Sequence, residues 1–164
     1  MNVLITGAAS QLGQQIIAEL VSNHQLRLLD STMPDIKHEN LEFIPGSIVD
    51  PKIANEAIQS IDVLIHTGEP PQSLPQDPLK RGQMLLDLAT RGTHVLFKAA
   101  VEAGVKRFIY GSTLEIFGSY PDDIYISEFY KPLPTPEIHQ MTRYLGELTC
   151  REFARMYMVT VTSL

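Results

Sequence analysis

The stretch that decides the fold is NVLITGAASQLG, residues 2–13. It starts with a short apolar run, residues 3–5, which is typical of a strand buried on both faces. Gly7 follows at once, and an amphipathic helical pattern then begins at Leu12. A strand, a glycine turn and a helix in this order predict the opening of a dinucleotide-binding βαβ unit, whose helix N-terminus offers N–H groups to a pyrophosphate.

The glycine loop departs from the usual three-glycine pattern, because Ser10 stands at its middle position. Gly7 permits a tight turn, and Gly13 permits close packing of the helix. The Ser10 hydroxyl is a candidate donor to a phosphate, and Gln11 and Leu12 begin the helix whose N–H groups face the anion. The alternative is an ordinary buried turn that binds nothing. We treat these five residues as candidate cofactor-binding residues.

Composition narrows the class of protein. The chain has 164 residues, of which 44% are hydrophobic, enough for one globular domain. Its net charge of −6 disfavours general nucleic-acid binding, and its single cysteine, Cys150, excludes an internal disulfide. No signal-peptide pattern, transmembrane run or metal-ligand spacing of histidines is found. We expect a cytoplasmic protein without a metal, and without nucleic acid or a membrane as partner.

The remaining apolar segments alternate between strand-like and helix-like patterns. Further strands are expected over residues 26–30, 41–44, 62–66, 105–110 and 158–164. Helices are expected over residues 51–60 and 79–103, and from the Thr135-Pro136-Glu137 cap onward. This alternation predicts an α/β fold, a Rossmann-type doubly wound parallel sheet with the strand order 3-2-1-4-5-6.

Residues at the ends of two strands are candidates for the same ligand. Asp30 ends the second strand, where a carboxylate is expected to accept hydrogen bonds from the adenosine ribose. Its charge would repel a 2′-phosphate, which favours NAD over NADP. The alternative is a solvated aspartate. His66 and Gly68 follow the fourth strand, at the edge where open α/β sheets bind their ligands.

Together these motifs resemble the extended short-chain dehydrogenases/reductases, also called the NAD-dependent epimerase/dehydratase family. The resembling segments are residues 6–13 (TGxxGxxG in the family), 46–50 (G-D-[IL]-x-D), 62–68 (D-x-V-x-H-x-A), 91–96 (within N-V-x-G-T-x-x-L-L) and 105–118 (V-K-R-F-V-Y-x-S-S-x-x-V-Y-G). The resemblance implies an NAD(P)-binding Rossmann domain over residues 1–164. It also places Ser47 and Ile48 at the cofactor, with Ser47 replacing the acid that usually binds the adenine amino group.

The catalytic positions implied by the resemblance are altered. Thr113 falls on the catalytic serine or threonine. In the family's Y-x-x-x-K motif, His139 stands at the tyrosine and Arg143 at the lysine, as residues 139–147 (HQMTRYLGE) fix the frame. His139 can exchange protons near neutral pH, and Arg143 keeps the positive charge that would hold the nicotinamide ribose. Neither replacement is conservative.

The resemblance therefore implies an oxidoreductase of the epimerase/dehydratase type, acting on a nucleotide-sugar-like or related hydroxyl substrate and impaired by His139 and Arg143. The alternative is a non-catalytic NAD-binding module or a structural dimer module. The family places its substrate pocket largely after the sixth strand, so we expect the C-terminal substrate-binding portion to be absent. The family also implies a homodimer through residues 82–103 and 137–156.

Overall fold

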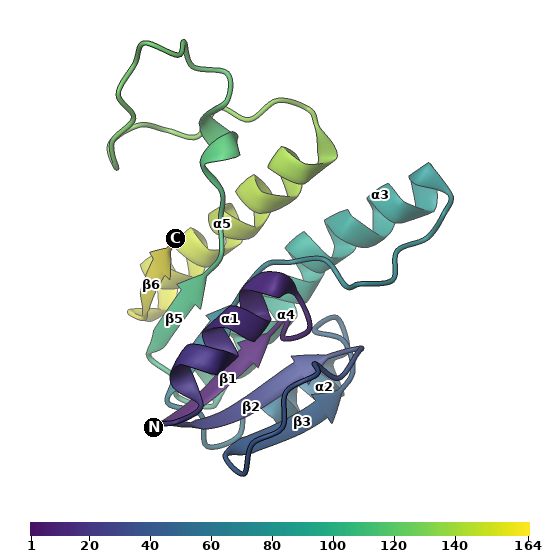
Figure 1. The fold of residues 1–164 in the computed structure, drawn as a ribbon. Coiled ribbons are helices and arrows are strands. Elements are labelled where there is room, and N and C mark those ends of the chain that lie inside the picture. The colour runs from purple at the N-terminus through teal and green to yellow at the C-terminus, as the bar shows by residue number, and fades with distance from the viewer.

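A computed structural model describes all residues, 1–164, and shows a parallel six-stranded sheet with helices on both faces (Figure 1). The strands are β1 (Asn2–Thr6), β2 (Gln25–Asp30), β3 (Leu41–Pro45), β4 (Val63–His66), β5 (Arg107–Tyr110) and β6 (Thr160–Ser163). They pair in the order β3-β2-β1-β4-β5-β6, and every pair is parallel. The predicted doubly wound sheet is therefore confirmed.

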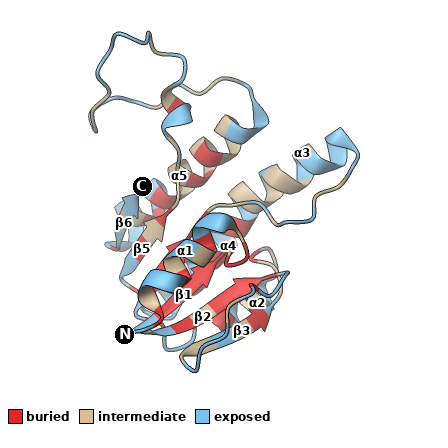
Figure 2. Ribbon diagram, viewed as in Figure 1, coloured by how far each residue is buried: buried red, intermediate tan, exposed pale blue.

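The helices are α1 (Gln11–Leu20), α2 (Pro51–Ala57), α3 (Pro78–Asp87), α4 (Thr93–Glu102) and α5 (Ile138–Tyr157), with the short 3-10 helix η2 (Leu114–Phe117). Helix α1 covers one face of the sheet, and α2, α4 and α5 cover the other. Neighbouring residues of β1 show this division. Ile5 packs with Ile17 of α1, whereas Leu4 packs with the cluster that contains Phe97 of α4. The central strands are buried on both faces, as their apolar sequences require (Figure 2).

One long helix was expected over residues 79–103, but the structure interrupts it. Helices α3 and α4 are joined by a π-helical turn, η1 (Leu88–Gly92). The Thr93 N–H donates to the Leu88 carbonyl, five residues back, as in a π turn. A π turn adds one residue to a helical turn and shifts the apolar pattern by that one position, which hydrophobic periodicity alone did not distinguish from a continuous α-helix.

The expected start of the last helix was also wrong. Helix α5 begins at Ile138 after Glu137, which makes no side-chain capping bond. Thr135 instead forms a turn in which its hydroxyl accepts from the Glu137 N–H, while Gln140 reaches back to accept from the Thr135 N–H at 2.8 Å. The hydroxyl and proline therefore shape the approach to the helix rather than its first turn.

Helix α3 projects beyond the sheet and has no buried residue (Figures 1 and 2). Leu79, in its first turn, has 82% of its surface exposed. Residues 119–136 form a loop that also extends away from the sheet. No helix of the chain combines the length and the apolar character needed to span a lipid bilayer.

Candidate functional site

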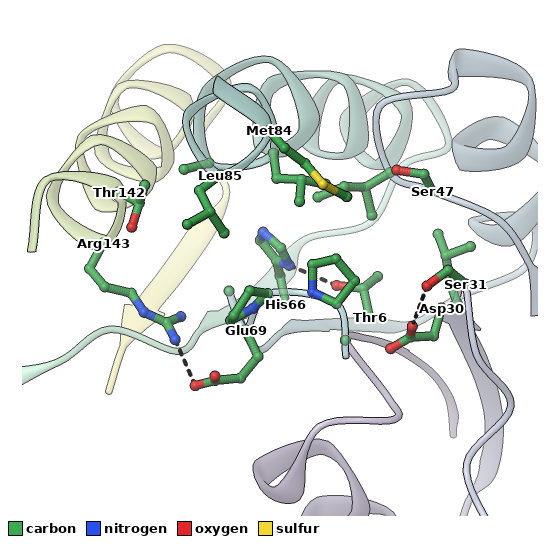
Figure 3. A pocket seen from close by; sticks show the side chains of 18 of the residues that line it. Thr6, Asp30, Ser31, Ser47, His66, Glu69, Met84, Leu85, Thr142 and Arg143 are labelled. Atoms are coloured by element: carbon green, nitrogen blue, oxygen red, sulfur yellow. Dashed lines mark hydrogen bonds and ion pairs between the residues drawn. The ribbon is translucent and has the colours of Figure 1, made fainter. Parts of the chain in front are cut away.

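A cavity of about 190 Å³ opens where β1, β2, β3 and β4 end. It is lined by Thr6, Gly7, Leu29, Asp30, Ser31, Gly46, Ser47, Ile48, His66, Gly68, Glu69, Pro70, Pro71, Met84, Leu85, Leu88, Ala89, Tyr110, Ile138, His139, Thr142 and Arg143. Its floor is the carboxyl edge of the sheet, and α3, the π turn and α5 form the opposite wall (Figure 3). This is the position at which doubly wound sheets bind ligands.

Asp30 lies at one end of the cavity and is 8% exposed. Its Oδ2 accepts from the Ala9 N–H at 3.0 Å, which ties the end of β2 to the glycine loop. Its Oδ1 accepts from the Thr32 N–H and the Ser31 hydroxyl at 3.2 and 3.3 Å. A carboxylate has about four acceptor positions, so Asp30 can accept a further hydroxyl donor.

The glycine loop has the tight geometry that its sequence predicted. Gly7 has a φ of +69°, and a Cβ on Gly13 would lie 2.8 Å from the Ala8 carbonyl oxygen. Ser10 caps α1: its hydroxyl accepts from the Gly13 N–H and donates to the Gly7 carbonyl. The Ser10 proton is therefore used within the loop. The N–H groups of Gln11 and Leu12 have no acceptor in the chain, as expected at an open helix N-terminus.

His66 forms part of the cavity floor and is almost fully buried. Its Nδ1 lies 2.7 Å from the Thr6 hydroxyl and its Nε2 lies 3.2 Å from the Thr93 hydroxyl, so both ring nitrogens are hydrogen-bonded within the protein. Burial, aided by the charge of Arg143, lowers the pKa of His66 to about 3. The imidazole is therefore neutral at physiological pH, and it cannot serve as a general acid there.

Arg143 reaches the cavity from α5 and is 4% exposed. Its Nη1 donates to the backbone oxygens of Thr67 and Gly111, and its Nη2 pairs with Glu69 Oε1 at 2.6 Å. A guanidinium carries five N–H donors, so Nε and one hydrogen of Nη2 remain without a protein acceptor. Arg143 can therefore hold a hydroxyl while keeping these contacts.

The other two predicted catalytic residues lie nearer the solvent. His139 lines the cavity, its side chain is 55% exposed, and its Nε2 lies 3.5 Å from Glu115 Oε2. Thr113 lies outside the cavity lining, and its hydroxyl accepts from the Glu115 N–H at the start of η2. The cavity thus brings His139 and Arg143 to one wall but does not include Thr113.

Some of the predicted cofactor residues line the cavity, and the others lie beside it. The cavity collects Gly7, Asp30, Ser47, Ile48, His66, Gly68 and Arg143. Ser10, Gln11, Leu12 and Gly13 belong to the loop and helix start that follow Gly7. A Cβ on Gly92 would lie 2.9 Å from Ile48, so glycine at the end of the π turn lets this wall approach the residues after β3.

Several residues of the cavity wall were not among the candidates predicted from the sequence. Glu69, Pro70 and Pro71 follow the fourth strand outside any predicted element, and Met84, Leu88, Ala89 and Thr142 lie on helices whose spatial neighbours the sequence does not specify. The acidic Glu69 directly after the His66-Thr67-Gly68 strand end was the one local signal that could have paired it with the cationic Arg143.

These features fit a dinucleotide. Asp30 offers an acceptor for ribose hydroxyls, the start of α1 offers the unpaired N–H groups of Gln11 and Leu12, and Arg143 has two N–H donors without a protein acceptor. The space between them is lined mostly by apolar groups that can contact planar rings.

Comparison with known proteins finds similarity over nearly the whole chain. The sequence model of the "NAD dependent epimerase/dehydratase family" matches residues 3–164. The chain is 28% identical over 153 residues to the uncharacterised protein y4nG of Sinorhizobium fredii, covering 92% of this chain and 37% of that protein. It is 25% identical to the NAD-dependent glucose-6-phosphate dehydrogenase of Haloferax volcanii, covering 98% of this chain and 66% of that protein.

Among solved structures, DesIV, a dTDP-glucose 4,6-dehydratase from Streptomyces venezuelae with NAD and TYD bound, superposes with a TM-score of 0.85 at 23% identity. The match covers 99% of this chain and 54% of DesIV, so the 164 residues span about half of that protein. This likeness supports the fold, and the sequence match over residues 3–164 identifies the group of proteins. The chain belongs to the NAD-dependent epimerase/dehydratase family.

Proposed function

We propose that this chain binds NAD across the cavity, with the adenosine ribose on Asp30 and the pyrophosphate at the N-terminus of α1. The nicotinamide half then extends toward His66 and Arg143. The observation that carries the proposal is the arrangement of the cavity, with an acidic acceptor at one end and an arginine with two unused N–H donors at the other. The neutral state of His66 avoids placing a second cation beside the oxidised nicotinamide.

NAD supplies hydride transfer when bound, and the activity we propose is oxidoreductase chemistry on a hydroxyl of a nucleotide-sugar-like or related substrate. The relatives that support this class are a dTDP-glucose dehydratase and a glucose-6-phosphate dehydrogenase. Arg143 would position the ribose, and His139 would exchange the proton of the substrate hydroxyl. Thr113 would orient that hydroxyl.

We propose further that turnover is impaired. His139 is directed toward Glu115 on the outer side of the site, and the imidazole is shorter than the phenol that it replaces. A well-placed general acid or base contributes a factor of about 10² to 10⁴, so its misplacement costs much of the rate. The Arg143 cation is also partly committed to Glu69 and to two carbonyl oxygens.

Calorimetric titration with NAD⁺ tests the binding proposal. Asp30→Asn keeps one oxygen that can accept from the Ala9 N–H but removes the charge, and we expect its Kd to rise at least about tenfold, or about 1.4 kcal/mol. Asp35→Asn, at an exposed position on the connection after β2, is the matched control and should bind as the parent chain does. Absence of binding at millimolar NAD⁺ would refute the proposal.

The activity is tested separately with two substrates. Oxidation of glucose 6-phosphate is followed by the absorbance of reduced nicotinamide, and turnover of dTDP-glucose is followed by chromatography of the sugar nucleotide, because a dehydratase returns the hydride to its product. We expect the double variant His139→Tyr/Arg143→Lys to turn over at least one of them faster than the parent chain. Equal or lower rates in the double variant, with NAD binding retained, would contradict the idea that these two residues limit catalysis.

A homodimer is part of the same proposal. Helix α3 exposes Leu79 and Leu86 and has no buried residue, and α5 exposes Ile138 and Met156. A second copy would cover these helices. Sedimentation velocity should show a dimer that Leu86→Glu weakens and that Leu114→Glu, on η2, leaves intact. A monomer at all concentrations would rule the dimer out.

A further inference from the structure

The base-binding end of the cavity contains hydroxyl groups where a purine would need a polar partner. We infer that Ser47 sets the base specificity of the site and lets it accept a 6-oxopurine dinucleotide about as well as NAD. This inference rests on the proposed NAD binding, and it adds a class of ligand that the family assignment does not contain.

The placement of Ser47 follows from the sheet. Pro45 of β3 pairs with Asp30 of β2, and the Gly46 N–H donates to the Asp30 carbonyl oxygen at 2.9 Å. Ser47 therefore comes directly after the residues that flank Asp30. Figure 3 shows Ser47 and Asp30 at the same end of the cavity, opposite Arg143 and Glu69. A base attached to a ribose on Asp30 has to lie against this end.

The walls of this end hold a base mainly through apolar contact. Ile48 lines it from the segment after β3, and Met84, Leu88 and Ala89 line it from α3 and the π turn. Such walls contact the faces of any purine with little preference. Discrimination between purines must then come from polar groups at the rim.

Two side-chain hydroxyls are available there, Ser31 and Ser47. The Ser31 hydroxyl donates to Asp30 Oδ1 at 3.3 Å, so its proton is engaged. Ser47 Oγ accepts a long hydrogen bond, 3.4 Å, from the Val49 N–H, and its own proton has no acceptor in the chain. Of the two hydroxyls, Ser47 is therefore the one with free capacity to pair with a base.

The chemistry at purine position 6 distinguishes the candidate ligands. Adenine carries an amino group there, which donates, and hypoxanthine carries a carbonyl oxygen, which accepts. At the neighbouring N1 the roles are reversed, since adenine accepts and hypoxanthine donates. A carboxylate at residue 47 directed at position 6 would accept from the amino group and repel the carbonyl oxygen. A serine hydroxyl can accept or donate, so Ser47 can pair with both bases. Because Ser47 stands where the family has an acid, the electrostatic repulsion of the carbonyl oxygen is also removed.

Titration with NAD⁺ and with nicotinamide hypoxanthine dinucleotide tests the inference on the parent chain, Ser47→Asp and Ser119→Asp. The parent chain should bind both dinucleotides with Kd values within about threefold of each other, since a hydroxyl can donate or accept. Ser47→Asp should weaken the hypoxanthine dinucleotide by about tenfold or more relative to NAD⁺, the effect of one unpaired polar group at a base. Ser119→Asp adds the same charge in an exposed loop and should leave the ratio unchanged.

The outcomes separate the two proposals. Failure of the parent chain to bind NAD⁺ would refute the proposed function. If the parent chain binds NAD⁺ but its Kd for the hypoxanthine dinucleotide is more than about tenfold higher, the proposed function stands and the role of Ser47 is overturned. An unchanged ratio in Ser47→Asp, with the variant folded by circular dichroism, would also overturn it.

Discussion

Nη2 of Arg143 lies 2.6 Å from Oε1 of Glu69, and this ion pair joins helix α5 to the loop after β4. The same loop is held at its other side, where Gln72 Nε2 donates to the Ala9 carbonyl at 2.9 Å. Residues 69–72 therefore connect α5 to the glycine loop. Arg143 stands at the position where the family has lysine. Its guanidinium pairs with Glu69 through one nitrogen and donates to two carbonyl oxygens through another, whereas a lysine would have a single ammonium group for all these contacts.

Glu69→Gln should lower the free energy of unfolding by about 1–2 kcal/mol, because it leaves the guanidinium of Arg143 buried without its counter-charge while Glu69 itself is partly exposed. Urea denaturation measures this change. Asp87→Asn breaks an exposed ion pair with Arg91 and serves as the control, with no resolvable change expected. Equal midpoints for both variants would contradict a stabilising role for the Glu69 pair.

Gly146→Ala should destabilise the fold by about 1–3 kcal/mol, because a Cβ there would collide with the hydroxyl of Tyr110, which is 1% exposed and cannot retreat. Gly82→Ala is the matched change in α3, where a Cβ meets nothing within 4 Å. It should stabilise the chain by up to about 1 kcal/mol through helix propensity. Thermal unfolding of both variants checks the opposite signs, and a stabilising Gly146→Ala would show that α5 sits farther from β5.

The neutral, buried state of His66 predicts a pH dependence of stability. The folded pKa, about 3, lies below the ordinary histidine value, so between these values the unfolded chain binds a proton that the folded chain does not. The contribution of His66 to the free energy of unfolding is therefore complete above about pH 6.5. It falls by about 1.4 kcal/mol per pH unit as the pH decreases toward 3. Urea midpoints at several pH values should show a weaker dependence in His66→Gln, whereas the exposed His38→Gln should keep the parent slope.

Cys150 is 1% exposed, and burial raises the pKa of its thiol. The thiolate is the reactive form, so the native chain should react with a thiol reagent much more slowly than the chain in denaturant. Release of the chromophore of a disulfide reagent measures both rates. Rapid reaction of the native chain would show that α5 opens away from the sheet.

NADP⁺ should bind more weakly than NAD⁺, because its 2′-phosphate would meet the carboxylate of Asp30. Asp30→Asn should bring the two dissociation constants closer together, because it weakens the binding of NAD⁺ and removes the repulsion of NADP⁺. Competitive calorimetry measures both dissociation constants. A parent chain that prefers NADP⁺ would show that Asp30 does not face the ribose.

The strand order and the position of the site were predictable because their causes are local. Apolar runs, glycine turns and amphipathic stripes repeat in order, and parallel connections leave few possible topologies. The place of Asp30 at the cavity was predictable for the same reason, since the end of the strand that follows the glycine loop and its helix has a fixed place in such a sheet. Its contact with a ribose stays a prediction. Family resemblance added His139 and Arg143, which no periodicity marks.

The contacts that define the site were not predictable, because they join distant residues. Glu69 and Arg143 are 74 positions apart, and their opposite charges alone do not single out this pair among the other acidic and basic residues of the chain. Ser10 was expected as a donor to phosphate, but capping of α1 and donation to the Gly7 carbonyl satisfy its hydroxyl first. Whether Ser10 also contacts a bound phosphate remains a prediction, as do the roles of Thr113 and His139.

The π turn between α3 and α4 makes the outer wall of the cavity tolerant of a change in residue number. Each residue of an α-helix advances the chain by about 100° around the axis, and the wider π turn spreads one extra residue over nearly the same rotation. Removing one residue from Leu88–Gly92 would turn the π turn into an α-helical turn and leave α3 in nearly the same orientation relative to α4. Met84 and Leu85 would keep their places on the cavity wall, although the chain had become one residue shorter.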